Sequence, residues 1–493
     1  MNKQVSQVGV AALVLIIALI VGTTYWQTWA NAGLADRQDN AIRLVAQFSI
    51  DRGKIYAADG KTLLATNVKK KVGGQTLYFR RYPTGPLFSD VVGYSTQTHN
   101  QTGLERAYND YLTGSNANLD TVFHKTLDKL KGTTIKGNDL VLTIRPGAQA
   151  LALRLLQGKC GAVVALEPRT GKVLVMATNP TYNPNLVEKN FRSIDRIRST
   201  ACQPAAPLLN RATAGLFTPG STFKMITASA ALDTGRFTPS SPFYDPGYCE
   251  EYGQRVRNAG NPEAPETFGS VDLTTGFEHS INSVFCNVGK TIGAKTILEY
   301  AKRYGFYDRV PLELPEDERA PSGLYFHHRL FDPKKPEFQV DPGRLAFGQE
   351  RMIVSPLQMA WVAATIANRG LQIKPHLVDR VLAPGGKVIV RMKPHKGGRP
   401  IKESTADELR HMMELAVSGG TGTAAQIPGI TVAGKTGTAE TGLNNVNTTW
   451  FAAFAPSEAP RVAIAVVVEN QRGGFGGTVS APIAKQVMEA ILR

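Results

Sequence analysis

The chain has 493 residues, 42% of them hydrophobic, and a formal net charge of +16. Two or more domains are expected at this length, and the hydrophobic fraction excludes wholesale disorder. The positive charge favours an anionic neighbour such as nucleic acid, a cell-wall polymer or anionic lipid. A solvated basic surface without a specific ligand would explain the charge equally well.

The amino terminus carries an apolar run from Val8 to Gly22 that continues to Trp29. About 20 such residues cross a bilayer as a helix. Lys3 and the amino group precede the run, which favours a cytoplasmic tail over residues 1–7 and a transmembrane anchor over residues 8–29. Tyr25, Trp26 and Trp29 suit the far membrane interface.

Two other interpretations of this run are a signal peptide and a buried core helix. Ala30-Asn31-Ala32 resembles the cleavage site of a signal peptide, and a buried core helix is a third reading. The run is long for a signal core, so we favour the uncleaved anchor. With either anchor or signal, the chain after residue 33 lies outside the cytoplasm, which argues against nucleic acid as a partner. We find no second run of comparable length, so a single span is expected.

Residues 30–138 are polar with short β-like stretches, which predicts a mixed amino-terminal module, and Gly137-Asn138-Asp139 marks a boundary. Residues 139–493 read as one larger domain. We expect strands at 161–167, 172–177, 430–433, 449–454 and 462–467, helices at 221–233, 355–369 and 480–492, and an irregular segment at 184–207. An early hairpin and a late meander predict an α+β fold, an antiparallel sheet flanked by helices.

The four cysteines are scattered without a C-x-x-C pair, so a metal site is not expected. Their even number permits zero, one or two disulfides, and the spacing does not choose among the pairings. They are Cys160, Cys202, Cys249 and Cys286.

Ser221-Thr-Phe-Lys224 begins the predicted helix at 221–233. A hydroxyl there lies near free backbone N–H groups and the positive end of the helix dipole. Residue i+3 lies on the same helical face, so Lys224 can reach the Ser221 oxygen. A lysine accepts the serine proton only when neutral, which burial or a second cation would favour. Taken alone, S-x-x-K is more often a helix cap beside a solvated lysine.

Two further motifs follow along the chain. Ser280-Ile-Asn282 can offer a hydroxyl for proton relay and an amide for a substrate carbonyl, although alone it resembles a helix cap or turn. Lys435-Thr436-Gly437-Thr438 would present a cation and hydroxyls to a carboxylate, and its glycine admits a close backbone. A solvated edge strand is the alternative for that motif.

S-x-x-K, S-x-N and K-T-G each occur once and in this order, and together they are the signature of serine penicillin-recognising enzymes. The chain therefore resembles the transpeptidase domain of penicillin-binding proteins. About a hundred residues between anchor and boundary are too few for the glycosyltransferase domain of class A, so class B is indicated. The layout is most similar to the actinobacterial penicillin-binding protein A group. Further segments carry the resemblance: Gly161–Leu166, Gly171–Leu174, Leu209–Ala212, Phe347–Gln349, Ser355–Ala360, Gly420–Gly422, Arg52–Ile55, Asp59–Gly60, Leu64–Ala65 and Gly103–Glu105.

The resemblance implies acyl transfer on peptidoglycan stem peptides ending in D-Ala-D-Ala, with β-lactam antibiotics acylating the same serine. It implies Ser221 as nucleophile, Lys224 as base, and the N–H groups of Ser221 and Thr438 as oxyanion hole. Thr436, Gly437 and Thr438 would bind substrate, with Lys435 supplying charge. Ser280 would pass a proton to the leaving amine, and Asn282 would orient the substrate amide. No metal or organic cofactor is implied.

Three functions stay open at this point. Besides a transpeptidase, the fold suits a carboxypeptidase or β-lactamase that uses water as acceptor, and a β-lactam sensor or non-catalytic scaffold. The amino-terminal module is expected to act as a pedestal, with a polytopic glycosyltransferase as a possible partner at the cytoplasmic membrane.

Overall fold

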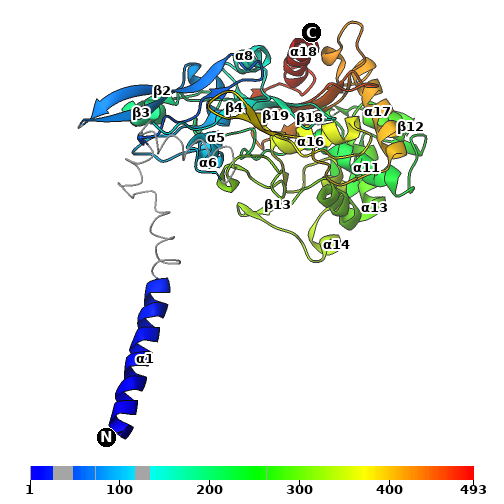
Figure 1. Cartoon of the computed structure of the whole chain (residues 1–493). Coiled ribbons are helices and arrows are strands. Elements are labelled where there is room, and N and C mark those ends of the chain that lie inside the picture. The colour runs from blue at the N-terminus through cyan, green and yellow to red at the C-terminus, as the bar shows by residue number, and fades with distance from the viewer. Residues whose placement is uncertain (1, 26–47, 73, 117–133, 262–263) are drawn as a thin grey trace.

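The computed structural model describes residues 2–25, 48–72, 74–116, 134–261 and 264–493. Helix α1 (Asn2–Tyr25) contains a stretch, Gln7–Tyr25, that is long and apolar enough to cross a membrane, and none of it is buried (Figure 1). One such helix is found within the described residues, in agreement with the single expected span. Trp26, Trp29 and the alternative cleavage site at 30–32 lie outside the described residues.

A six-stranded sheet forms one end of the body, around β2 and β3 in Figure 1. Its order is β17 (Val388–Arg391), β16 (Val378–Leu382), β4 (Asp139–Leu142), β1 (Ile55–Tyr56), β2 (Leu63–Val72) and β3 (Gln75–Arg81). The strands come from both sides of the expected boundary at residue 139. The amino-terminal segment and the larger domain therefore share one sheet.

A five-stranded antiparallel sheet forms the centre of the larger domain. Its order is β18 (Ala433–Glu440), β19 (Val446–Ala455), β20 (Val462–Arg472), β5 (Cys160–Leu166) and β6 (Val173–Asn179). Pairing of β20 with β5, in the register Val466 opposite Val163, joins the late meander to the early hairpin. The predicted α+β fold with an antiparallel sheet is confirmed.

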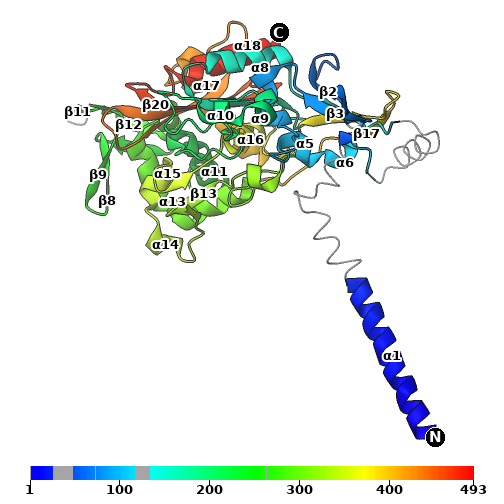
Figure 2. The same ribbon diagram turned by 90° about the vertical axis from the view of Figure 1, so that its left-hand side faces the viewer.

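Helices cover both faces of this sheet. Every residue of β5 is buried, and alternate residues along it enter different cores, as the two-residue repeat of a strand requires. One core includes α8 (Pro146–Leu155) and α18 (Ser480–Leu492), which lie together in Figure 2. The other includes α11 (Lys224–Asp233), α13 (Asn282–Arg303), α16 (Pro356–Ala367) and α17 (Glu403–Ser418).

Helix α16 begins where the sequence predicts it. Ser355 accepts a hydrogen bond from Gln358 N, and Pro356 occupies the first turn, where no intrahelical donor is needed. All twelve of its residues are buried, which explains its predominantly apolar sequence.

Smaller elements complete the described fold. The short strands are β7 (Pro242–Asp245), β8 (Tyr248–Glu251), β9 (Gln254–Arg257), β10 (Gly260–Asn261), β11 (Ala264–Pro265), β12 (Gly269–Asp272), β13 (Gly323–Phe326), β14 (Arg329–Leu330) and β15 (Met352–Ile353). The short helices are η2 (Gly85–Phe88), α4 (Ser89–Val92), α5 (Gly103–Ala107), α6 (Asn109–Leu112), α9 (Asn185–Lys189), α10 (Phe191–Asp195), η3 (Gly220–Phe223), α12 (Leu273–Glu278), η4 (Glu316–Glu318), α14 (Pro336–Gln339), α15 (Pro342–Ala346) and η5 (Thr423–Ala425).

Two of the predicted segments are wrong in part. The strand expected at 430–433 instead begins at Ala433 and runs to Glu440, while Ile430 only bridges Ile427. Strand propensity favoured the β-branched residues, but continuous pairing with β19 decides the register and overrides the two glycines. The segment at 184–207 is not wholly irregular, because α9 and α10 lie within it.

Both disulfides that the cysteine count permitted are present. Cys160 is bonded to Cys202, and Cys249 is bonded to Cys286. The first joins the first residue of β5 to the segment after α10. The second joins β8 to α13.

Candidate active site

Ser221 lies on a single 3-10 turn, η3, that leads directly into α11. The sequence predicted a helix beginning at Ser221, and the α-helix itself begins three residues later, at Lys224. Gly220 has a φ of 52°, a conformation that glycine adopts without steric cost. Ser221 is partly exposed, whereas Lys224 is fully buried.

The Lys224 side chain reaches the second motif. Its Nζ donates to the carbonyl oxygen of Ser280 at 2.6 Å and to Oδ1 of Asn282 at 2.9 Å, and it lies 3.3 Å from the Ser280 hydroxyl. The first two oxygens only accept hydrogen bonds. A neutral amine would use its two hydrogens there and keep its lone pair for a proton.

The connection between α12 and α13 positions this second motif. Ser280 has a φ of 60° and turns the chain between the two helices, and Asn282 is the first residue of α13. Its amide nitrogen Nδ2 donates to the carbonyl oxygen of Arg257 at 3.1 Å. The Asn282 amide is therefore held from both ends.

Strand β18 lies directly against the Ser221 turn. A Cβ atom on Gly437 would lie 2.7 Å from the carbonyl oxygen of Pro219, and one on Gly220 would lie 2.6 Å from that of Thr438. Both glycines are thus required by the close approach of two backbones. The three sequence motifs, predicted to converge, are brought together.

Burial controls the charge of both lysines. Burial lowers the pKa of Lys224 well below its ordinary value, and the positive charge of Lys435 lowers it further. Burial also lowers the pKa of Lys435, to about 7. The Lys224 amine lies 5.1 Å from the centroid of the Phe285 ring, and that of Lys435 lies 5.5 Å from Phe277.

The threonines of β18 have partners that sequence reasoning missed. The hydroxyls of Thr436 and Thr421 are 2.6 Å apart, and Gly476 N donates to Thr438 Oγ1 at 3.3 Å. Thr421 belongs to the segment Gly420–Gly422, which resembles the corresponding segment of the transpeptidase domain. That resemblance was the only sequence signal that could have indicated this contact. Behind the strand, the indole of Trp450 donates to the carbonyl oxygen of Thr218 at 2.9 Å and supports the turn before Ser221.

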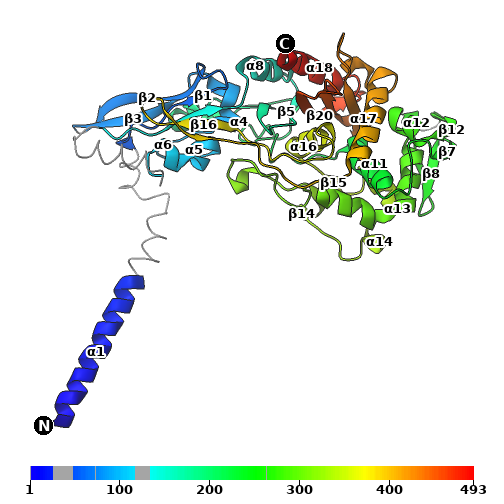
Figure 3. The ribbon, with the colours of Figure 1, turned by 45° about the vertical axis from the view of Figure 1, so that its right-hand side comes forward.

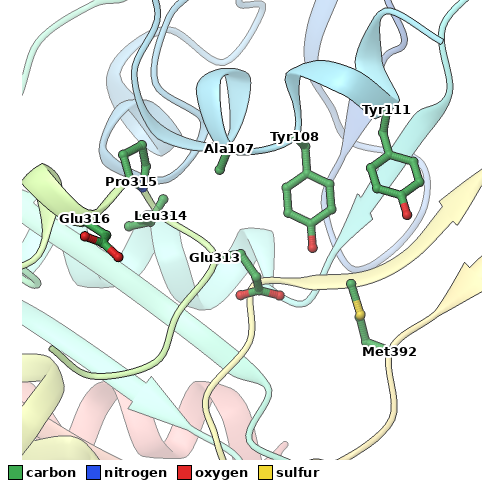
Figure 4. A pocket seen from close by; sticks show the side chains of 8 residues that line it. All are labelled: Ala107, Tyr108, Tyr111, Glu313, Leu314, Pro315, Glu316 and Met392. Atoms are coloured by element: carbon green, nitrogen blue, oxygen red, sulfur yellow. The ribbon is translucent and has the colours of Figure 1, made fainter. Parts of the chain in front are cut away.

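A separate pocket of about 470 Å³ lies where the amino-terminal segment meets the larger domain (Figure 4). Tyr108, Tyr111, Glu313 and Met392 line it from different parts of the chain. None of its lining residues belongs to the three motifs.

Two clusters of cysteine and glutamate have the spacing of metal ligands. One contains Glu469 and the other Glu251, each with two cysteines. Because these cysteines are joined in disulfides, they offer no thiolate to a metal.

The site and the fold together define a class of protein. The site contains a partly exposed serine at a helix start, a buried lysine of low pKa and an S-x-N turn. The K-T-G motif lies on the edge strand of the five-stranded antiparallel sheet. This combination is typical of serine acyl-enzyme proteins that recognise penicillin.

Comparison with known proteins identifies the family within that class. Residues 161–489 match the penicillin-binding protein transpeptidase domain, and residues 52–140 match the dimerisation domain of penicillin-binding protein A. The chain belongs to the penicillin-binding protein transpeptidase family, as its motifs predicted, and its relatives include the penicillin-binding protein A group.

The relatives match over the whole length. The chain is 34% identical to peptidoglycan D,D-transpeptidase PbpA of Mycolicibacterium smegmatis, over 100% of this chain and 99% of that protein. It is 33% identical to the protein of the same name from Mycobacterium tuberculosis, with the same coverage. The structure of penicillin-binding protein A from M. tuberculosis as a ceftriaxone acyl-enzyme complex superposes with a TM-score of 0.80 at 31% identity, covering 91% of this chain and 100% of that one.

Proposed function

We propose that the chain is a peptidoglycan D,D-transpeptidase that cross-links stem peptides through an acyl-enzyme on Ser221 and is acylated there by β-lactams. The observation that carries this proposal is the meeting of the three motifs: the Lys224 amine contacts Ser280 and Asn282, and β18 lies against the turn that contains Ser221. The relatives named as D,D-transpeptidases and the β-lactam acyl-enzyme structures of penicillin-binding protein A support it.

In the acylation step, the Ser221 oxygen attacks the penultimate carbonyl carbon of a stem peptide. Neutral Lys224 accepts the hydroxyl proton, and its lowered pKa favours this neutral form. The N–H groups of Ser221 and Thr438 stabilise the negative charge that develops on the carbonyl oxygen. Collapse of this intermediate breaks the peptide bond and releases D-alanine, whose amine takes a proton through Ser280.

The terminal carboxylate of the donor peptide is assigned to β18. Thr436 and Thr438 offer hydroxyls, and Lys435 contributes positive charge when protonated. Because β18 is the edge strand of its sheet, an extended peptide can lie along it.

In the second step, an amine from a neighbouring stem attacks the acyl-enzyme carbonyl carbon. The ester bond to Ser221 breaks, the Ser221 oxygen takes up the proton that the amine loses, and the new peptide bond is the cross-link. Asn282 orients the substrate amide through its side-chain amide. In the structure it also holds Lys224, which adds a role that the motif alone did not indicate.

The location that we propose is supported by α1. We propose a cytoplasmic tail over residues 1–7, an anchor over 8–29, a pedestal over 30–138 and an extracytoplasmic transpeptidase domain over 139–493. The length and composition of α1 support a single-pass anchor. A polytopic glycosyltransferase in the same membrane is the partner that this arrangement suits.

The test uses full-length protein in detergent with a synthetic stem peptide as donor and a second stem peptide with a free side-chain amine as acceptor. Mass spectrometry should detect cross-linked dimers and released D-alanine. Ser221→Ala should form neither, while its circular dichroism stays unchanged. Hydrolysed donor without dimer would indicate a carboxypeptidase instead, and penicillin acylation without any peptide product would indicate a sensor or scaffold.

A further inference from the structure

A buried carboxylate lies close to the second motif without belonging to it. Asp245 ends β7 and is 1% exposed. Its oxygens accept from Gly247 N at 2.9 Å, from Phe268 N at 2.9 Å, and from Asn258 Nδ2 at 2.9 and 2.8 Å. The hydroxyl of Ser283 also donates to it. So many donors around one carboxylate hold it in a single orientation.

Asn258 transmits this anchoring to α13. Its Oδ1 accepts from Ser283 N at 3.0 Å. That N–H belongs to the first turn of the helix, which has no intrahelical acceptor for it, and the cap residue Ile281 supplies no side-chain hydrogen bond. A side chain 25 residues away thus replaces the local cap.

The residue between these contacts is Asn282. Its Nδ2 donates to the carbonyl oxygen of Arg257, the neighbour of Asn258, and this leaves Oδ1 facing the Lys224 amine. We call residues 245–258 the strap. The strap sets which end of the Asn282 amide meets Lys224, and the disulfide between Cys249 and Cys286 joins the same two elements one turn further along α13. Figure 3 shows β7, β8 and β12 beside α12 and α13.

We infer that Asp245 and Asn258 are positioning residues for acyl transfer, acting through Ser283 and Asn282 on the Lys224 base. This inference rests on the proposed function of Ser221 and Lys224. Neither residue contacts the Lys224 amine. They set the position of the start of α13, where Asn282 accepts a hydrogen bond from the Lys224 amine.

Asp245→Asn places an amide nitrogen against the donors Asn258 Nδ2 or Phe268 N, and Asn258→Ala removes the acceptor for Ser283 N. Each should lower the first-order rate of penicillin acylation by about 10- to 100-fold, since a misplacement of about 1 Å has that effect. The dissociation constant of the non-covalent penicillin complex should change little, because the β18 contacts remain. Stopped-flow measurement with a fluorescent penicillin on the full-length protein separates the two constants.

The double variant Asp245→Asn/Asn258→Asp exchanges the amide and the carboxylate, and restores one donor–acceptor pair between the two positions. It should recover part of the lost rate, which two independent structural defects would not do. Ser283→Ala removes a single hydroxyl and should lower the same rate by a smaller factor. It serves as the test if Asp245→Asn does not fold.

Asp233→Asn is the matched control. Asp233 is also a buried aspartate, accepting from Tyr300 OH at 2.7 Å, Lys402 N at 2.7 Å and Thr405 Oγ1 at 2.8 Å, but it lies at the far end of α11 from Lys224. The folded fraction of the Asp233→Asn protein should be acylated by penicillin at the wild-type rate. Equal rates for the strap variants and wild type would overturn the inference, as would an equal loss in Asp233→Asn. Absence of acylation in the wild-type protein would instead overturn the proposed function.

Discussion

A Cβ atom on Gly437 would lie 2.7 Å from the carbonyl oxygen of Pro219. Real Cβ atoms do not approach a backbone oxygen so closely, so either β18 or the Ser221 turn would have to move. Strand β18 and the Ser221 turn are therefore in direct backbone contact at this point, with no side chain between them.

Gly437→Ala should consequently reduce penicillin acylation at Ser221 strongly and destabilise the fold by about 1–3 kcal/mol, the usual effect of overpacking. Gly147→Ala is the control, because a Cβ atom at that helical position meets nothing within 4 Å. It should leave acylation unchanged and keep or slightly raise the melting temperature. Thermal unfolding and fluorescent-penicillin labelling of both variants check this.

The rate of acylation should depend on pH through Lys224. The amine must be neutral to accept the serine proton, so the rate falls as pH is lowered through its pKa. Burial and Lys435 depress that pKa well below 10.5, so the acidic limb should lie far below the ordinary lysine range. A pH–rate profile whose acidic limb stayed near 10.5 would contradict a buried Lys224 base.

Lys435→Gln should move this acidic limb to higher pH. The substitution removes the cation that disfavours protonation of Lys224, so the pKa of Lys224 rises. The variant should also bind peptides with a free carboxylate more weakly, because protonated Lys435 supplies attraction below its own pKa of about 7. The pH–rate profiles of wild type and variant, recorded with the same penicillin, measure this shift. Coincident profiles would show that Lys435 does not lower the pKa of Lys224.

A buried ion cluster should dominate the stability of the amino-terminal segment. Glu105 is fully buried between Arg52 and Arg80, each at 2.7 Å. Glu105→Gln leaves two buried guanidinium groups without their counter-charge and should cost about 3–5 kcal/mol. Asp317→Asn breaks an exposed pair with Arg106 and should cost less than about 1 kcal/mol. Urea unfolding of the two variants compares them directly.

The same cluster predicts the direction of acid sensitivity. Burial alone raises the pKa of Glu105, but the charges of Arg80 and Arg52 outweigh it and lower the pKa below its ordinary value. A carboxylate whose pKa is depressed in the folded state stabilises the fold above its unfolded pKa, and this contribution is lost as pH falls through the folded value. The stability gap between wild type and Glu105→Gln should therefore narrow below about pH 4.

Much of the site could be predicted because its signals are local. The spacing of Ser221 and Lys224 follows from one helical turn, and K-T-G is recognisable as a short motif. The order and context of the three motifs then indicated that they meet. The antiparallel sheet could be predicted for the same reason, since its strands are apolar and regularly interrupted.

The remainder depends on contacts between distant segments that leave no local pattern. Asp245 and Asn258 are ordinary polar residues in the sequence, and only the folded chain brings them to the start of α13. Strand β18 was placed too early because its glycines have poor strand propensity, which pairing with β19 overrides. Likewise, nothing near Val378 indicates that it pairs with Leu142 in the sheet of the amino-terminal segment.

The most direct test of the account is mass spectrometry of the penicillin-treated full-length protein after protease digestion. We expect one penicilloyl adduct on the peptide that contains Ser221, a loss of this adduct in Ser221→Ala, and a large reduction in Lys224→Ala. An adduct on another residue, or undiminished labelling of Ser221→Ala, would contradict the assignment of the nucleophile.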